Sequence, residues 1–336
     1  MTQRWVALAV SLWIFASMAQ PFDLQGHRGA RGLVPENTLA AFSRALAIGV
    51  TTIEMDAAIT KDDVVVVSHD PALNPAITRG PDGKWIAGPR GPLIRDSTYA
   101  ELQRYDVGRL DTDSAYAKTF PDQVPHDGTR IPKLSEVFDL VKRSGNREVQ
   151  FDIETKVFPL APGDTIAPEA FARRLIAEIR RAGMERRTMI QSFDWSTLQV
   201  VRKEAPEIRT VYLTIRRQGL DNMCTGAAKA KPQAPISDCD ASPWTAGFQL
   251  REHGSVARMV KAAGGDIWSP YFNDLDAEQL REARALGLRV IPWTVNNPAD
   301  IAKVLDLGVD GIISDRPDRV REEMKRRGMP LPSAVQ

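Results

Sequence analysis

The alternation of short apolar segments with longer amphipathic segments is the feature that most constrains the fold of this chain. Parallel strands need a long crossover, usually a helix, so the alternation predicts a parallel sheet with right-handed crossovers. Eight segments have strand character: 22–27, 51–59, 148–155, 188–193, 209–214, 266–270, 289–295 and 311–314. Helical patterns follow at 38–48, 134–143, 168–182, 196–204, 255–263, 277–286, 298–307 and 317–327. Eight strand–helix units predict an α/β fold, a (β/α)8 TIM barrel.

The remaining segments are predicted to be insertions in a single barrel. The chain has 336 residues, and residues 20–330 are enough for one barrel domain. Residues 71–130 and 216–253 are irregular and rich in glycine, proline and charged side chains, so we expect insertions there. The segment 64–69, which begins with the β-branched run 64–67, follows a polar turn at Lys61-Asp62. It predicts a hairpin arm beside the strand 51–59, with the first insertion directly after it.

The first 19 residues have the pattern of a secretory signal peptide. Arg4 precedes an apolar run of 14 residues, 5–18, which is short for a membrane span. Small residues at Ser17 and Ala19 predict cleavage after Ala19, although an uncleaved anchor is the alternative. Because no later segment is apolar enough to span, we expect no stable membrane insertion after cleavage, and export to the periplasm or the medium.

Two cysteines and a balanced charge limit the partners. Cys224 and Cys239 have 14 residues between them. In an exported chain an even pair favours an intrachain disulfide over two unpaired thiols. Two cysteines alone do not make a zinc site. The net charge is +1, so no basic field indicates a nucleic-acid partner.

Polar residues interrupt the predicted strands at their carboxyl ends, where TIM barrels carry their chemistry. Glu54 and Asp56 share one face of a strand by their i, i+2 spacing, and Glu154 ends the neighbouring strand. Three crowded carboxylates repel each other unless a cation neutralises them. Oxygen ligands favour one hard cation, Ca²⁺ or Mg²⁺, over zinc.

Two histidines and two positively charged side chains are predicted to surround this metal site. His27 ends the first strand, and the hairpin would return His69 to the level of the two strand carboxylates. Two imidazoles suit displacement at phosphorus, one as base and one as acid. Arg28 and Lys156 are placed to hold phosphate oxygens.

Further residues near the predicted site carry weaker signals. Glu36 stands at a helix start, and we count it among the candidate substrate-binding residues. Trp293 ends the seventh strand and could pack on a glycerol or head group. Asp315 is interpreted as a turn or helix-cap residue. Asp70 is interpreted as a turn former, and the alternative is that it orients His69.

Several motifs, in order, resemble the glycerophosphodiester phosphodiesterase family. They are HRGARGLVPENTLAAF at 27–42, IEMDAAITKDDVVVVSHD at 53–70, FDIETK at 151–156, QSFD at 191–194, WTVN at 293–296 and DGIISDRP at 310–317. The resemblance implies that His27 and His69 are catalytic and that Glu54, Asp56 and Glu154 bind the metal. It also implies hydrolysis of glycerophosphodiesters such as glycerophosphocholine to sn-glycerol 3-phosphate and an alcohol, with Ca²⁺ or Mg²⁺.

Two alternatives remain at this point. A related barrel enzyme of lysophospholipase D or phospholipase type would act on lipids, and it would need an apolar mouth or membrane-binding loops. A non-catalytic exported binding protein could keep the barrel, but the retention of both histidines and all three carboxylates argues against it.

Overall fold

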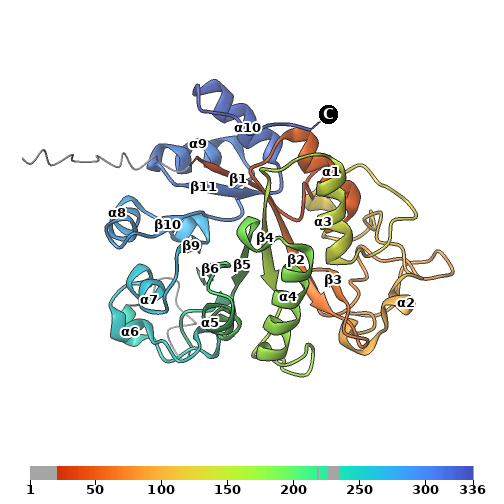
Figure 1. Cartoon of the computed structure of the whole chain (residues 1–336), viewed down its shortest axis with the longest axis horizontal. Coiled ribbons are helices and arrows are strands. Elements are labelled where there is room, and N and C mark those ends of the chain that lie inside the picture. The colour runs from red at the N-terminus through yellow and green to blue at the C-terminus, as the bar shows by residue number, and fades with distance from the viewer. Residues whose placement is uncertain (1–20, 218, 226–234, 336) are drawn as a thin grey trace, which may run out of the picture.

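Eight parallel strands form the centre of the molecule (Figure 1). The computed structural model describes residues 21–217, 219–225 and 235–335. Their order around the sheet is β10-β9-β6-β5-β4-β2-β1-β11, with the short strand β3 (Val65–Val67) antiparallel on β2. The parallel strands are β1 (Asp23–Gly26), β2 (Thr52–Ile59), β4 (Gln150–Thr155), β5 (Thr188–Ser192), β6 (Arg209–Thr214), β9 (Ile267–Pro270), β10 (Arg289–Val290) and β11 (Gly311–Ser314).

Backbone hydrogen bonds close this sheet into a barrel between the β10 region and β11. Asp310 N–H donates to Val290 O (2.9 Å), Ile313 N–H to Pro292 O (3.0 Å) and Val295 N–H to Ile313 O (3.0 Å). The helices between strands are α1 (Leu39–Ile48), α3 (Leu134–Arg143), α4 (Pro168–Ala182), α5 (Trp195–Glu204), α6 (Leu250–His253), α7 (Val256–Ala262), α8 (Ala277–Ala285), α9 (Pro298–Leu307) and α10 (Pro317–Arg326). The predicted TIM barrel is confirmed.

The predicted seventh strand, 289–295, is wrong in its length. Regular strand structure stops at Val290, although Ile291 and Trp293 still donate to carbonyl groups of β9. Pro292 has no N–H to donate, so a continuous ladder cannot pass through it. The other predicted strands differ from the observed ones by no more than two residues at either end.

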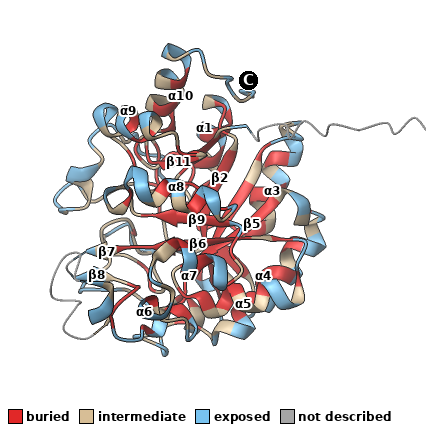
Figure 2. Cartoon of the chain, turned by 90° about the vertical axis from the view of Figure 1, so that its left-hand side faces the viewer, coloured by how far each residue is buried: buried red, intermediate tan, exposed pale blue. Residues whose placement is uncertain are grey.

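The inside of the barrel has an apolar half and a polar half. The apolar half is a cluster inside the barrel that includes Met189 of β5, Val211 of β6 and Ile313 of β11. The next or preceding residues, Ile190, Tyr212 and Ile312, belong to the outer core between the strands and the helices. In β1, β2 and β4 the residues beside the outward-packed Leu24, Ile53 and Ile153 are instead polar and buried: Gln25, Glu54 and Asp152. Figure 2 shows the buried strands inside and the exposed outer surfaces of the helices. The buried polar residues continue to the carboxyl ends of β1, β2 and β4, which form one side of the opening of the barrel, its mouth.

Residues 71–130 pack as a small layer on the outer side of the β2–β3 hairpin. Their apolar side chains Leu73, Ile94, Leu102 and Val107 form a separate cluster with Ala58 and Val66 of the hairpin and with Ile131, which directly follows the segment. The short helix α2 (Tyr99–Leu102) begins with a capping box between Thr98 and Glu101. The segment therefore has some core of its own.

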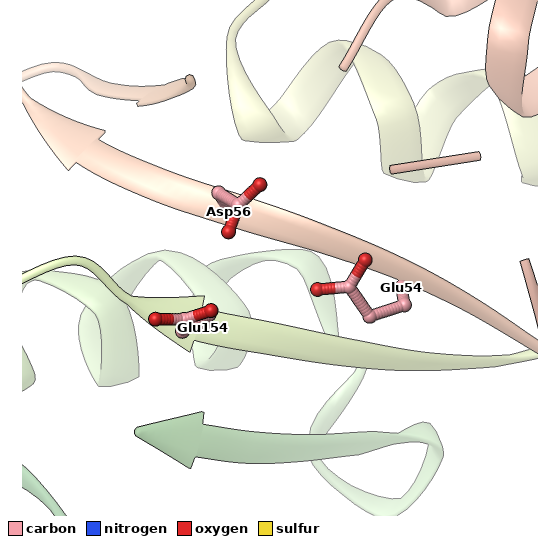
Figure 3. A group of neighbouring side chains, drawn as sticks. All are labelled: Glu54, Asp56 and Glu154. Carbon is pink, nitrogen blue, oxygen red and sulfur yellow. The ribbon is translucent and has the colours of Figure 1, made fainter. Parts of the chain in front are cut away.

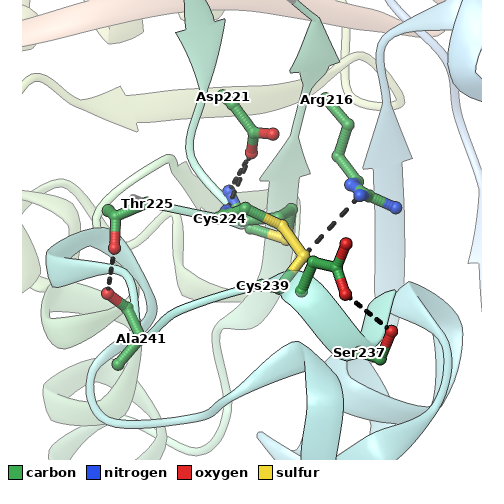
Figure 4. Close-up of a disulfide and its surroundings, with 9 residues drawn as sticks. Arg216, Asp221, Cys224, Thr225, Ser237, Cys239 and Ala241 are labelled. Carbon is green, nitrogen blue, oxygen red and sulfur yellow. Dashed lines mark hydrogen bonds between the residues drawn. A yellow bond between two sulfur atoms is a disulfide. The ribbon is translucent and has the colours of Figure 1, made fainter. Parts of the chain in front are cut away.

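A disulfide joins Cys224 and Cys239 in the second predicted insertion, which confirms the expected pairing (Figure 4). Both cysteines are buried, and the backbone N–H of Cys224 donates to Asp221 (2.8 Å). Residues 226–234 and the predicted signal peptide, 1–19, lie outside the described part of the chain. Within that part, no helix is both long and apolar enough to cross a membrane.

Candidate active site

Glu54 and Asp56 of β2 and Glu154 of β4 converge at the mouth of the barrel (Figure 3). Asp56 lies directly opposite Glu154 in the parallel ladder, and Glu54 is two residues earlier on the same face. One ligand atom from each carboxylate lies within 4.8 Å of the others, and all three residues are buried. The structure thus brings together the three predicted metal ligands.

The environment of these carboxylates fits a bound cation. Burial, with the charge of Asp56, raises the pKa of Glu54 well above its usual range. Burial likewise raises the pKa of Glu154 to about 7, against the opposing effect of Lys156. Among the described residues no group hydrogen-bonds Asp56 Oδ1, although it is buried. In the part of the chain that the structure describes, three buried carboxylates lie beside only two cationic side chains, Arg28 and Lys156, and one carboxylate oxygen accepts no hydrogen bond. This arrangement suits a hard divalent cation.

The loop after β1 places Arg28 beside the acidic residues. Its N–H donates to Glu54 Oε2 (2.7 Å), its Nε lies 3.1 Å from Asp56 Oδ2, and its guanidinium pairs with Glu36 (2.6 Å). Arg28 has a φ of 50°, and Gly29 a φ of 86°. A Cβ at Gly29 would lie 2.7 Å from the backbone of Ala41 in α1, so this tight turn requires glycine.

The helix that follows contributes through the residues before its first turn. Thr38 is the N-cap of α1 and its hydroxyl accepts from Ala41 N–H (3.1 Å). Asn37, at a φ of 55°, donates from Nδ2 to Asp56 Oδ2 (2.9 Å). From the opposite side, Gln191 of β5 donates to Glu54 Oε1 (2.7 Å). These two amides hold the carboxylates in place.

His27 is held between Asp315 and Glu54. Its Nδ1 lies 2.6 Å from Asp315 Oδ1, and its Nε2 is 3.9 Å from Glu54 Oε2. Asn296 donates to the other Asp315 oxygen (2.7 Å). Burial, followed by the charge of Arg31, lowers the pKa of His27 to about 4. Because Asp315 engages Nδ1, Nε2 is the ring atom that faces the acidic residues.

His69 reaches the same site from the hairpin, as predicted. Thr60 N–H donates to Val64 O (3.1 Å) at the turn, and Ser68 N–H donates to Asp56 O (2.9 Å) at the other end. His69 Nδ1 lies 2.8 Å from Asp70 Oδ1. Burial, then the charges of Arg28 and Lys156, lower the pKa of His69. Each histidine therefore has one nitrogen against a carboxylate.

Lys156 follows β4 and Trp293 follows β10, and both lie near Phe193, which follows β5. Lys156 Nζ is 2.8 Å from Glu154 and 3.7 Å from Asp56, and 5.9 Å from the ring centre of Phe193. Trp293 packs edge-on against Phe193 at 5.3 Å and donates from Nε1 to Ser269 O (2.9 Å). Trp293 thus contacts the site through an aromatic neighbour.

Sequence reasoning missed Asp315, Tyr116 and the amides Asn37 and Gln191. Asp315, read as a turn or cap residue, directly follows β11, which neighbours β1. Because the carboxyl ends of neighbouring parallel strands meet at one face of the barrel, Asp315 could have been predicted to lie beside His27. Tyr116, whose hydroxyl donates to Glu36, lies in an irregular segment without a comparable sequence signal.

The fold and this strand-end site define the class of the protein: a TIM barrel with a candidate metal centre at its mouth. The model of the glycerophosphoryl diester phosphodiesterase family matches residues 27–319. The chain belongs to that family, and it is an enzyme with glycerophosphodiester phosphodiesterase activity.

Individual relatives agree with this assignment along most of the chain. A glycerophosphodiester phosphodiesterase of Caldanaerobacter subterraneus subsp. tengcongensis is 28% identical over 303 residues, covering 90% of this chain and 97% of the relative. A crystal structure from Silicibacter pomeroyi, described as a glycerophosphoryl diester phosphodiesterase, is 36% identical with a TM-score of 0.78, covering 92% and 95%. An Oleispira antarctica phosphodiesterase in complex with sn-glycerol-3-phosphate shares the fold, with 20% identity and a TM-score of 0.61 over 90% and 96%.

Proposed function

We propose that the enzyme uses one divalent cation to hydrolyse glycerophosphodiesters such as glycerophosphocholine to sn-glycerol 3-phosphate and an alcohol. The observation that carries the proposal is the convergence of three buried carboxylates, two histidines and two cationic side chains at one end of the barrel. The product complex of the Oleispira antarctica phosphodiesterase supports this substrate class for the fold.

Glu54, Asp56 and Glu154 would hold the cation, either Ca²⁺ or Mg²⁺. When bound, it supplies a positive charge that polarises a non-bridging phosphate oxygen. Arg28 and Lys156 are the side chains that would hold phosphate oxygens. Glu36 would act through its ion pair with Arg28, and Trp293 would border the substrate beside Phe193.

His27 and His69 would be the general acid and base. One Nε2 takes the proton of the attacking hydroxyl, from water or from the adjacent glycerol position, as its oxygen bonds to phosphorus. If the glycerol hydroxyl attacks, water must then open the cyclic phosphate to give sn-glycerol 3-phosphate. The other Nε2 donates a proton to the leaving oxygen as its bond to phosphorus breaks. Asp315 and Asp70 hold the Nδ1 atoms, which keeps both rings oriented for these transfers.

The test is to incubate the purified protein, without residues 1–19, with glycerophosphocholine and assay glycerol 3-phosphate, with and without EDTA. We expect release that EDTA abolishes. A parallel incubation with lysophosphatidylcholine distinguishes the lipid-cleaving alternative, which would release choline faster from the lipid. No release from glycerophosphocholine in the presence of Ca²⁺ or Mg²⁺ would contradict the proposal.

We also propose that the enzyme is exported, because a signal-like segment precedes β1 and a disulfide is present, as is usual outside the cytosol. Export predicts that protein recovered from the periplasm or the medium begins at Gln20 and contains no free thiol. N-terminal sequencing and thiol titration of that fraction check both points. Protein found only in the cytosol, starting at Met1, would contradict export.

A further inference from the structure

Tyr116 brings the 71–130 segment into contact with the loop between β1 and α1. Its hydroxyl donates to Glu36 Oε2, across 80 residues of sequence, and accepts from Arg31 Nη1 (3.2 Å). Burial and the adjacent Glu36 raise the pKa of Tyr116, which keeps the phenol protonated as a donor. None of the sequence motifs includes this residue.

The two partners of Tyr116 lead to two different parts of the site. Arg31 Nε lies 2.5 Å from Asp315 Oδ1, the same atom that contacts His27 Nδ1. Glu36 Oε1 accepts from Arg28 Nη1 (2.6 Å), and Arg28 Nε lies 3.1 Å from Asp56. The Tyr116 hydroxyl therefore links the branch that orients His27 to the branch that holds Arg28. It also reinforces the longer ion pair between Arg31 and Glu36 (3.9 Å).

Other contacts fix the segment in this position. The Tyr116 ring lies 5.1 Å from that of Phe120, and the Arg31 guanidinium lies 4.9 Å from the centre of the Phe120 ring. Gln123 donates to Arg31 O (2.7 Å), and Val124 N–H donates to Leu33 O (2.9 Å). Removing only the Tyr116 hydroxyl would leave these contacts in place.

We propose that Tyr116 is a positioning residue of the reaction, so that the 71–130 segment completes the active site. The proposal rests on the function proposed above. A hydrogen bond to an ionised carboxylate is stronger than one between neutral groups, so the phenol can restrain Glu36 and, through it, the Arg28 guanidinium. Through Arg31 it restrains the carboxylate of Asp315 that orients His27.

The test is Tyr116→Phe, assayed with glycerophosphocholine at equal concentrations of folded protein. We expect kcat/KM to fall about 10-fold, as for other groups that orient a ligating or reacting side chain, with little change in melting temperature. Tyr99→Phe is the matched control. It removes another tyrosine–glutamate hydrogen bond of the same segment, to Glu136 (3.3 Å), and should keep wild-type kcat/KM.

A double-mutant cycle separates positioning from general support. Tyr116→Phe and Glu36→Gln should be coupled, so the double variant should lose little more than the worse single variant. Fully additive losses, or a Tyr116→Phe variant that loses melting temperature but no kcat/KM, would overturn the proposal. An inactive wild type would overturn the proposed function as well, whereas an active wild type with an equally active Tyr116→Phe would overturn only the role of Tyr116.

Discussion

Replacing His27 by alanine should lower kcat by about 10²–10⁴-fold, the usual contribution of a general acid or base. Its Nε2 is the ring nitrogen directed toward the acidic residues, because Asp315 engages Nδ1. His69→Ala should have an effect of the same order, since Asp70 holds that ring in the same way. Steady-state kinetics with glycerophosphocholine at saturating cation measure both variants.

His126 provides the matched control for the histidine variants. It lies in the 71–130 segment and is exposed, so His126→Ala should retain wild-type kcat. Near-normal turnover in both His27→Ala and His69→Ala would show that the assignment of the two imidazoles is wrong.

A substrate with a better leaving group would assign the two roles. A glycerophosphate ester of p-nitrophenol needs little protonation of its leaving oxygen. The variant that lacks the general acid should therefore recover much of its rate with this substrate. The variant that lacks the base should remain impaired. Equal recovery of both variants would contradict a division of roles between His27 and His69.

Removal of the cation is the second large effect. Treatment with EDTA, or the substitution Glu154→Gln, should lower turnover by more than about 10²-fold, because the cation is expected to contribute several kcal/mol of charge stabilisation. Glu154→Gln removes one of three negative charges with little change in side-chain size. Turnover assays after EDTA and after readdition of Ca²⁺ or Mg²⁺ measure the effect, and calorimetric titration measures cation binding.

Asp152→Asn is the control for the loss of a buried carboxyl group in the same strand. Asp152 is buried two residues before Glu154 but is not one of the three grouped carboxylates. Burial, with the charge of Asp23, raises the pKa of Asp152 well above its usual range, so the neutral amide is a close replacement. Asp152→Asn should keep its cation affinity and turnover. Wild-type turnover that EDTA leaves unchanged would contradict the cation assignment.

Spacing along the chain was enough to predict much of the site. Glu54 and Asp56 share a face because side chains in a strand alternate with a period of two. Glu154 could be added because parallel strands end at the same edge of the sheet. His69 could be placed because a short turn and a β-branched run determine a hairpin with little freedom in its pairing.

Contacts between distant segments could not be predicted in this way. Asp315 meets His27 across 288 residues because β11 closes the barrel beside β1, and closure depends on the packing of all the strands. Tyr116 reaches Glu36 because an irregular segment folds back onto the loop between β1 and α1, and no periodic pattern predicts its path.

Local periodicity and the common direction of parallel strands were enough to predict the barrel and where along it the three carboxylates and the two histidines lie. The partners that hold those groups depend on the packing of distant segments: Asp315 at His27, and Tyr116 between Arg31 and Glu36. Spacing along a strand determines on which face of the sheet a side chain lies. The neighbour that it meets there depends on how remote loops pack.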